Sequence, residues 1–228
     1  MLTAIIVAAG SSRRMGLDKL FAEIAGKPVI AHTVAAFDSA NVVTAIVIVA
    51  REDRHREIES IVRDQNFKKI HAIVSGGEHR QDSVRAGLDH LPESARHVAV
   101  HDAARPLVTP EQIERVYQVA REHGAAALAA TVSDTLKRAD VDLVVNSSVD
   151  RHQLFAMQTP QIFERKMVEE AYRVILADKV AVTDEVSAIE RIRGKVVLVP
   201  NEQPNFKITY PGDLAMAEFV LNQRAKRG

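Results

Sequence analysis

A turn of small residues followed by positive charges comes directly after the first apolar run of the chain. Ala8, Ala9 and Gly10 have small side chains or none, so their backbone N–H groups can approach an anion closely. Arg14 and Lys19 follow and can form charge-assisted hydrogen bonds with phosphate. The spacing is neither that of a dinucleotide-binding glycine motif nor that of a P-loop. The segment predicts another kind of phosphate site; the alternative is a tight turn with solvated cations.

A pair of glycines follows a later apolar run. Gly76 and Gly77 permit positive φ and a close approach of the backbone to a flat base. Ser83 stands early in the next predicted helix, where its hydroxyl can hydrogen-bond the edge of a base. The alternative is an ordinary turn with a helix cap.

A carboxylate and two further cations complete the candidate chemistry. Asp102 follows an apolar run, a suitable place for a ligand of Mg²⁺, which takes one or two carboxylates together with substrate phosphates. The alternative is that Asp102 caps a turn and pairs with Arg105. Lys207 is the one cation in a short apolar run, and its alternative is a lysine whose stem packs while its amine reaches water.

Other motifs predict structure rather than chemistry. His97 and His101 are four residues apart, but no third ligand accompanies them, so we interpret them as core or surface histidines. Thr183, Asp184 and Glu185 most simply cap a helix. The chain has no cysteine, which excludes thiolate catalysis and fits a reducing compartment. Its 30 basic and 30 acidic residues cancel, which argues against a nucleic-acid-binding protein.

The elements that must position these residues alternate between buried strands and helices. Strands this apolar are buried on both faces, which indicates a parallel sheet of right-handed βαβ units. Ligands of such sheets bind beyond the carboxyl ends of the strands, where the candidate residues stand. The predicted strands are Leu2–Ala8, Val42–Val49, Ile70–Val74, Val98–His101, Ala125–Val132, Lys195–Val199 and Phe206–Ile208. The predicted helices are Pro28–Phe37, Asp53–Asp64, Arg80–Leu91, Thr109–His123, Glu164–Ala177, Asp184–Ile192 and Gly212–Gln223.

The alternation breaks once, at Ser133–Phe163, where short polar pieces are typical of a β-hairpin arm. An arm that cannot bury its own face is a natural dimerisation element. We therefore expect one α/β domain over residues 1–228 with an arm at about 133–163. We expect a cytoplasmic protein, because no apolar run is long enough to span a membrane and no basic segment precedes the first strand.

Together, these motifs closely resemble the 2-C-methyl-D-erythritol 4-phosphate cytidylyltransferase family, in order and over essentially the whole chain. Each motif alone is weak, and the ordered set is specific. The matching segments are Ala8-Ala9-Gly10 with Arg14 and Lys19, Gly76-Gly77-Glu78 with Arg80, Asp82, Ser83 and Val84, His101–Pro106, Asp134–Lys137, Thr159-Pro160-Gln161, Thr183-Asp184-Glu185 and Lys207-Ile208-Thr209.

The resemblance implies a Rossmann-like, mostly parallel sheet with helices on both faces and a β-arm that crosses a homodimer. It implies transfer of a cytidylyl group from CTP to a polyol phosphate, 2-C-methyl-D-erythritol 4-phosphate, with Mg²⁺ at Asp102. The implied catalytic cations are Arg14, Lys19 and Lys207. The implied nucleotide pocket comprises Ala8, Ala9, Gly10, Gly77, Glu78 and Ser83. The implied polyol-phosphate site comprises Asp102, Arg105 and Thr159, with Thr135 and Arg151 from the partner's arm.

The chain departs from the family pattern at three places. Asp18 stands where proline is common, Glu78 where aspartate is common, and Ser11-Ser12 replaces a more glycine-rich pair. None removes a charge that the chemistry needs. Three alternatives stay open: a ribitol-5-phosphate cytidylyltransferase, a sugar-1-phosphate nucleotidyltransferase that uses another base, and a non-catalytic nucleotide-binding module. The last would be expected to lack one of the three implied catalytic cations.

Overall fold

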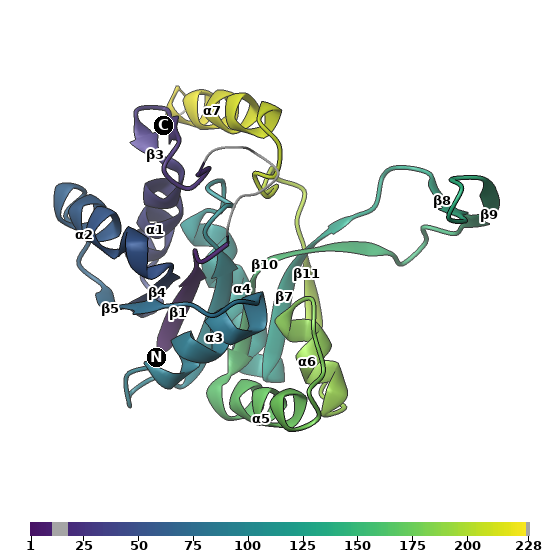
Figure 1. The fold of residues 1–228 in the computed structure, drawn as a ribbon, viewed down its shortest axis with the longest axis horizontal. Helices are drawn as coiled ribbons and strands as arrows, with labels where there is room; N and C mark the ends of the chain where they lie inside the picture. The colour runs from purple at the N-terminus through teal and green to yellow at the C-terminus, as the bar shows by residue number, and fades with distance from the viewer. Residues whose placement is uncertain (11–17, 227–228) are drawn as a thin grey trace.

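One open sheet forms the centre of the protein in the computed structural model, which describes residues 1–10 and 18–226 (Figure 1). Within those residues the sheet has seven strands in the order β11-β7-β10-β6-β1-β4-β5. Neighbouring strands are parallel except at β10, which is antiparallel to both β6 and β7. The predicted α/β class with a mostly parallel sheet is therefore confirmed. The strands are β1 (Leu2–Val7), β4 (Val43–Ala50), β5 (Ile70–Ser75), β6 (His97–Asp102), β7 (Ala125–Thr131), β10 (Phe155–Glu164) and β11 (Val197–Pro200).

Helices cover both faces of the sheet because its central strands are apolar on both sides. In β1, Leu2, Ala4 and Ile6 pack into one hydrophobic cluster, whereas Ile5 packs into the other. The first cluster includes residues of α1 (Val29–Ser39), α2 (His55–Asp64), α4 (Pro110–His123) and α7 (Gly212–Ala225). The second includes residues of α3 (Arg80–Asp89), α5 (Arg165–Ala177) and α6 (Glu185–Arg191).

Local sequence signals set the ends of α4. The Thr109 hydroxyl accepts a hydrogen bond from the backbone N–H of Gln112, whose side chain accepts one from the N–H of Thr109. Pro110 follows at the first helical position, and Gly124 ends the helix with a φ of 83°. The predicted start of this helix is confirmed. Three short elements complete the body: β2 (Glu23–Ile24), β3 (Lys27–Pro28) and the 3₁₀ turn η1 (Glu52–Arg54), which starts the predicted helix over 53–64.

The C-terminal part of the predicted arm belongs to the body instead. Residues 155–163, expected in the arm, lie in β10, inserted between β6 and β7. The sequence hid this strand because a proline within a run argues against a central strand. The structure accommodates Pro160 at a register shift between Met157 and Gln161, where the ladder with β7 is interrupted.

The arm itself is a two-stranded hairpin that extends far from the body (Figure 1). Its strands, β8 (Leu136–Ala139) and β9 (Val145–Val149), pair only with each other among the described strands. Its tip leaves apolar side chains in solvent, with Val141 95% and Leu143 85% exposed.

The strand predicted over 206–208 is absent. This segment makes no ladder, and the backbone N–H of Ile208 donates to the carbonyl of Ala104 at 2.8 Å. An apolar run near the C-terminus resembles a strand, but this one packs against the loop after β6. That position brings Lys207 into the site described below.

Candidate active site

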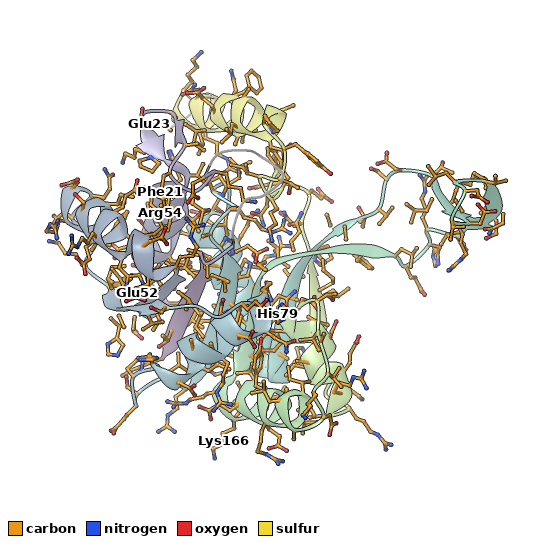
Figure 2. All side chains as sticks on the ribbon, viewed as in Figure 1. Phe21, Glu23, Glu52, Arg54, His79 and Lys166 are labelled. Atoms are coloured by element: carbon orange, nitrogen blue, oxygen red, sulfur yellow. The ribbon has the colours of Figure 1, made fainter. Side chains whose placement is uncertain are left out.

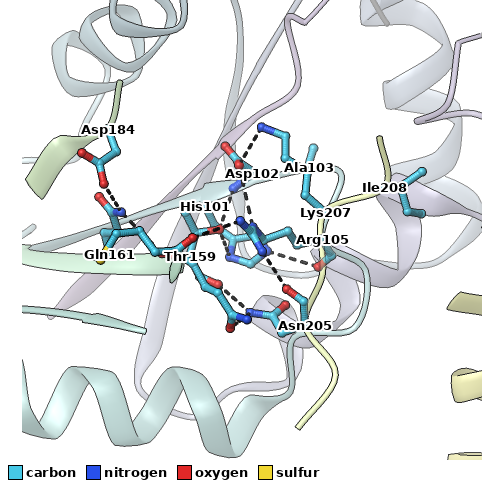
Figure 3. A network of polar contacts seen from close by, with 12 residues as sticks. His101, Asp102, Ala103, Arg105, Thr159, Gln161, Asp184, Asn205, Lys207 and Ile208 are labelled. Atoms are coloured by element: carbon cyan, nitrogen blue, oxygen red, sulfur yellow. Dashed lines mark hydrogen bonds and ion pairs between the residues drawn. The ribbon is translucent and has the colours of Figure 1, made fainter. Parts of the chain in front are cut away.

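The site is centred on Asp102, the last residue of β6, next to the end of β1. Its carboxylate accepts hydrogen bonds from Arg80 Nε (3.2 Å to Oδ1) and Lys207 Nζ (2.9 Å to Oδ2). Arg105 Nε lies 3.8 Å from Oδ2, and Figure 3 shows Lys207 and Arg105 beside Asp102. Burial alone would raise the pKa of Asp102, but the charges of Arg80 and Lys207 outweigh burial and hold that pKa well below its ordinary value. Asp102 is therefore an anion held among cations. The alternative expected Asp102 to cap a turn and pair with Arg105; the pairing is present, but the contacts with Arg80 and Lys207 are shorter.

A buried histidine and a threonine hold the backbone at Asp102. The N–H of Asp102 donates to Thr159 Oγ1 at 3.1 Å, and Thr159 Oγ1 also lies 3.0 Å from His101 Nδ1. His101 Nε2 is 3.3 Å from the carbonyl of Arg105. A neutral imidazole that donates from Nε2 and accepts at Nδ1 satisfies every partner. Burial lowers the pKa of His101 to about 3, so this neutral form persists. The interpretation of His101 as a core residue is confirmed.

Backbone carbonyls fix Arg105. Its guanidinium donates to the carbonyl of Asn205 at 2.7 Å and to that of Met157 at 3.4 Å. Burial lowers the pKa of Arg105, with the charge of Asp102 opposing that effect. Arg105 thus occupies a fixed, largely buried position beside Asp102.

The C-terminal segment brings two lysines together. Lys19 Nζ donates to the carbonyl of Ile208 at 2.6 Å, and Ile208 is the neighbour of Lys207. Two of the three predicted catalytic cations therefore meet at one segment. The third, Arg14, lies outside the described residues.

Asp18 joins the segment that carries Lys19 to the region after β4. Asp18 Oδ2 accepts from Arg51 Nη2 at 2.8 Å and lies 3.1 Å from Arg54 Nε. The Arg54 guanidinium lies 5.0 Å from the ring centroid of Phe21 (Figure 2). The departure at Asp18 thus adds an ionic contact with a neighbouring loop.

The predicted nucleotide residues gather around the ends of β1 and β5. A Cβ added to Gly76 would lie 2.4 Å from the Cβ of Ala9 and 2.7 Å from Ser83 Oγ, so these three residues are in close contact. Ser83 is buried on α3, and its hydroxyl donates to the carbonyl of His79. Ala8 is anchored by its N–H to the carbonyl of Val49 at 2.7 Å. The remaining predicted residues, Gly10, Gly77 and Glu78, are exposed at the same edge.

A cavity of about 420 Å³ opens beside Asp102, which is enough for a small phosphorylated polyol. Cations line one part of it, and polar residues from β10 and α6 line another. Its lining consists of Arg80, Asp102, Arg105, Met157, Gln158, Thr159, Gln161, Thr183, Asp184, Val186, Ser187, Glu190 and Lys207.

The arm residues predicted for substrate binding do not line this cavity. Thr135 and Arg151 are exposed, directly before β8 and shortly after β9, and neither lines the cavity. Arg151 Nη1 donates to the carbonyl of Ser133, at the start of the arm. Within one protomer, the structure does not bring these two residues to Asp102.

Two charged residues were missed as parts of the site. Arg80 contacts Asp102, and Glu185 holds Arg80 with both carboxylate oxygens. Asp184 is the helix cap, accepting from the N–H of Ser187, whereas Glu185 is buried. The sequence of residues 183–185 could have indicated a separate role for Glu185, because only one of two consecutive acids is needed to cap a helix start.

A divalent cation fits this site only in the company of a substrate. In the described ranges, no group of three or more histidine, aspartate or glutamate side chains is arranged to hold a metal. A Mg²⁺ ion that arrives with phosphate oxygens needs only one or two protein carboxylates, and Asp102 lines the cavity together with Arg80, Arg105 and Lys207. Asp102 is therefore the residue that would hold such an ion. No helix in the described part of the chain is long and apolar enough to cross a membrane.

Comparisons with known proteins show which family the chain resembles. The model of the 2-C-methyl-D-erythritol 4-phosphate cytidylyltransferase family matches residues 2–223. A protein of that name from Dehalococcoides mccartyi is 39% identical over 221 residues, which cover 96% of each chain. Another, from Caldanaerobacter subterraneus, is 40% identical over 225 residues, 97% of this chain and 99% of that protein.

Solved structures show the same fold. The 4-diphosphocytidyl-2C-methyl-D-erythritol synthase of Anaerococcus prevotii has a TM-score of 0.86 and 30% identity, covering 97% of this chain and 96% of its own. The enzyme named 2-C-methyl-D-erythritol 4-phosphate cytidylyltransferase from Thermus thermophilus has a TM-score of 0.81 and 26% identity, covering 96% and 98%. The fold, the cation-lined site and these relatives define a nucleotidyltransferase. Within that class, the chain belongs to the 2-C-methyl-D-erythritol 4-phosphate cytidylyltransferase family.

Proposed function

We propose that this protein transfers the cytidylyl group of CTP to 2-C-methyl-D-erythritol 4-phosphate and releases pyrophosphate, a step in the synthesis of isoprenoid precursors. The observation that carries the proposal is the cluster around Asp102, where Arg80, Arg105 and Lys207 meet at the mouth of a cavity in a chain of this family. The cytoplasmic location expected from the sequence stays a prediction.

The reaction needs positioned charge rather than a base. A phosphate monoester is largely dianionic at neutral pH because its second pKa is about 6. One of its oxygens attacks the α-phosphorus of CTP, a new P–O bond forms, and the bond to the bridging oxygen breaks as pyrophosphate leaves. The barrier lies in bringing anions together and stabilising the charge that develops, which preorganised cations do.

The residues divide this work. Lys19 and Lys207, with Arg14, bind the CTP phosphates and stabilise the charge at the α-phosphoryl group. Mg²⁺ bound at Asp102 would neutralise part of the phosphate charge. Two contacts support this assignment: Lys207 Nζ donates to Asp102, and Lys19 Nζ donates to the carbonyl of Ile208. Both amines are thus bound to oxygen atoms that phosphate oxygens can replace.

The substrates occupy two regions. The base of CTP lies at the close-packed edge formed by Ala9, Gly76 and Ser83, with Ala8, Gly10, Gly77 and Glu78 around it. The polyol phosphate lies in the cavity against Asp102, Arg105 and Thr159. The second region has cations for a phosphate and hydroxyl and amide groups for a polyol.

A homodimer completes the site in this proposal. A lone two-stranded hairpin is marginally stable in water, yet this one exposes Val141, Leu143, Val144 and Val145 at its tip. A second copy of the chain would cover these side chains. Thr135 and Arg151 of that copy would then contact the polyol phosphate, which accounts for their absence from the cavity lining of their own chain.

Pyrophosphate release from CTP tests the function directly. The purified protein, supplied with Mg²⁺, is assayed with methylerythritol 4-phosphate, ribitol 5-phosphate and a sugar 1-phosphate, and then with each of the other nucleoside triphosphates. We expect turnover with CTP and methylerythritol 4-phosphate. Preference for ribitol 5-phosphate would replace the proposed acceptor, and nucleotide binding without pyrophosphate release would indicate a binding module.

Lys19→Ala tests the assignment of charge stabilisation. Removing one preorganised electrostatic donor lowers kcat by about 10²–10³-fold, and we expect a loss of that size with little change in the KM of the polyol phosphate. Lys19→Arg should restore only part of it, because a planar fork replaces a compact charge. Steady-state kinetics with each substrate varied in turn measures both effects. Near-normal turnover of Lys19→Ala would show that the phosphate assignment is wrong.

A further inference from the structure

Arg80 stands where a cation is unfavourable. It is the first residue of α3, and the positive end of the helix dipole lies there. Two carboxylates compensate: Glu185 Oε1 and Oε2 accept from Arg80 Nη1 and Nη2 at 2.6 and 2.9 Å, and Asp102 Oδ1 accepts from Nε at 3.2 Å. Burial alone lowers the pKa of Arg80, but the charges of Glu185 and Asp102 outweigh it and raise that pKa above its ordinary value. Arg80 is a permanent cation shared by two acids.

Glu185, which binds Arg80, is itself fixed by burial and by hydrogen bonds. Its side chain is 0% exposed, and the Tyr172 hydroxyl donates to Oε1 at 2.9 Å. Burial and the charge of Glu185 raise the pKa of Tyr172, which keeps that hydroxyl protonated as a donor. The backbone N–H of Glu185 donates to Gln161 Oε1 at 3.1 Å, which ties the start of α6 to β10. Neither oxygen of Glu185 points to solvent.

The orientation of the guanidinium decides which oxygen of Asp102 binds Arg80: it is Oδ1, while Oδ2 binds Lys207. Each terminal nitrogen of Arg80 donates one hydrogen to Glu185, which fixes the orientation of the guanidinium with Nε toward Asp102 Oδ1. Asp102 Oδ2 stays on the side of Lys207 and the cavity. Without Glu185 the guanidinium would be free to turn and to present a terminal nitrogen together with Nε to Asp102. A bidentate Arg80–Asp102 pair would then compete with Lys207 and substrate for both carboxylate oxygens.

We propose that Glu185 is a positioning residue that acts through Arg80 to keep Asp102 Oδ2 available to Lys207 and the polyol phosphate. The inference rests on the proposed function, because it assigns a contact of that reaction. It gives the buried ion pair a role beyond stability, for which such pairs are weak evidence by themselves. It also connects α6, which lines the cavity, to the reacting centre.

Kinetics of Glu185→Gln tests the proposal. Gln keeps the size of the side chain but not its charge, so it holds Arg80 less firmly. We expect the KM of the polyol phosphate to rise about tenfold, since a displacement near 1 Å is enough for such effects, and the KM of CTP to stay within about twofold. Glu185→Asp, which retains the carboxylate, should recover part of the loss. Arg80→Lys should behave like Glu185→Gln because it keeps the charge and loses the fork.

A double-mutant cycle separates positioning from folding. Glu185→Gln is combined with Asp102→Asn, and binding of the polyol phosphate is measured by calorimetry as well as by turnover. If Glu185 acts through Asp102, its substitution has little further effect once Asp102 is changed. Additive effects, or a Glu185→Gln protein that is less stable but binds the polyol phosphate normally, would overturn the proposal. If Glu185→Gln does not fold, Arg80→Gln combined with Glu185→Gln removes both buried charges together and gives the same comparison.

The matched control is Glu169→Gln. Glu169 forms an ion pair with Arg165 at 2.7 Å on α5, outside the cavity lining. This substitution should change neither KM. A wild-type protein inactive with CTP and every acceptor would refute the proposed function. An active wild type with an equally effective Glu185→Gln variant would refute the positioning role alone.

Discussion

At the scale of single residues, the site depends on a histidine that stays neutral. His101 is completely buried between the ring of Phe37, with ring centroids 4.9 Å apart, and the hydroxyl of Thr159. A protonated imidazole would donate from both nitrogens, and Thr159 Oγ1 would then have to accept from His101 as well as from Asp102. The hydrogen bonds that orient the backbone at Asp102 therefore depend on the low pKa of His101.

That low pKa predicts a specific pH dependence of stability. Burial lowers the pKa of His101 from 6.5 to about 3. Between these two pH values the unfolded chain binds a proton at this residue and the folded chain does not. The free energy of unfolding therefore falls as the pH drops through that window, by about 2 kcal/mol from this residue between about pH 7 and pH 5. His101→Asn should lose less stability over the same interval, although it starts less stable. Denaturant unfolding of both proteins at the two pH values measures the difference, and equal losses would contradict the assignment.

At the scale of elements, the sequence predicted features set by neighbouring residues but not contacts between residues far apart in the chain. The start of α4 could be predicted because Thr109, Pro110 and Gln112 act within one turn. The Arg80–Glu185 pair joins residues 105 positions apart, and nothing in either local pattern indicates the other. The resemblance supplied Asp102 and Lys207 by position, but the cations that share Asp102 became visible only when β6, α3 and the C-terminal segment were placed together.

The strand β10 shows the same limit. Its sequence alternates and contains Pro160, features that favour an edge or a hairpin, whereas the structure places it in the middle of the sheet. The ladder with β7 is interrupted at residues 158–160, and there the Thr159 hydroxyl accepts a hydrogen bond from the backbone N–H of Asp102 at the end of β6. The sequence pattern predicted that this segment belongs to the hairpin arm, and it could not show that β10 pairs between β6 and β7.

The junction of β1, β5 and α3 gives a prediction at this scale. Gly76→Ala would place a Cβ 2.4 Å from that of Ala9 and 2.7 Å from Ser83 Oγ, so the strand end and the helix must separate. We expect the KM of CTP to rise about tenfold with a smaller change in the KM of the polyol phosphate. The control is Gly212→Ala at the start of α7, where nothing lies within 4 Å. Kinetics with each substrate varied would contradict the nucleotide assignment if only the polyol phosphate were affected.

At the scale of the whole molecule, the proposed homodimer would build each site from two chains. A protomer holds Lys19, Lys207 and Asp102 in its body and Arg151 on its arm. If the arm crosses to a second copy, each site combines a body and an arm from different chains. The two kinds of residue can then be inactivated separately.

Mixed dimers test this arrangement. Lys19→Ala lacks a cation of the body. Arg151→Ala should raise the KM of the polyol phosphate with less effect on CTP, because in the proposed dimer Arg151 would bind that phosphate in ground and transition states alike. In a Lys19→Ala/Arg151→Ala heterodimer, one site of the two receives both intact residues, so part of the activity should return. Light scattering first establishes the dimer, and differently tagged chains establish the mixture. A monomer at micromolar concentration, or no recovery in purified heterodimers, would refute the shared site.

The way in which the arm leaves the body has a consequence for how the fold can change. Thr131, at the end of β7, and Phe155, at the start of β10, lie directly opposite each other in the ladder. The chain between them departs and returns at one point of the sheet, so a two-residue type I′ turn would bridge the same gap without altering any strand order. The strand order and register of the body therefore do not depend on the length of the arm, and a change in that length would leave both unaltered.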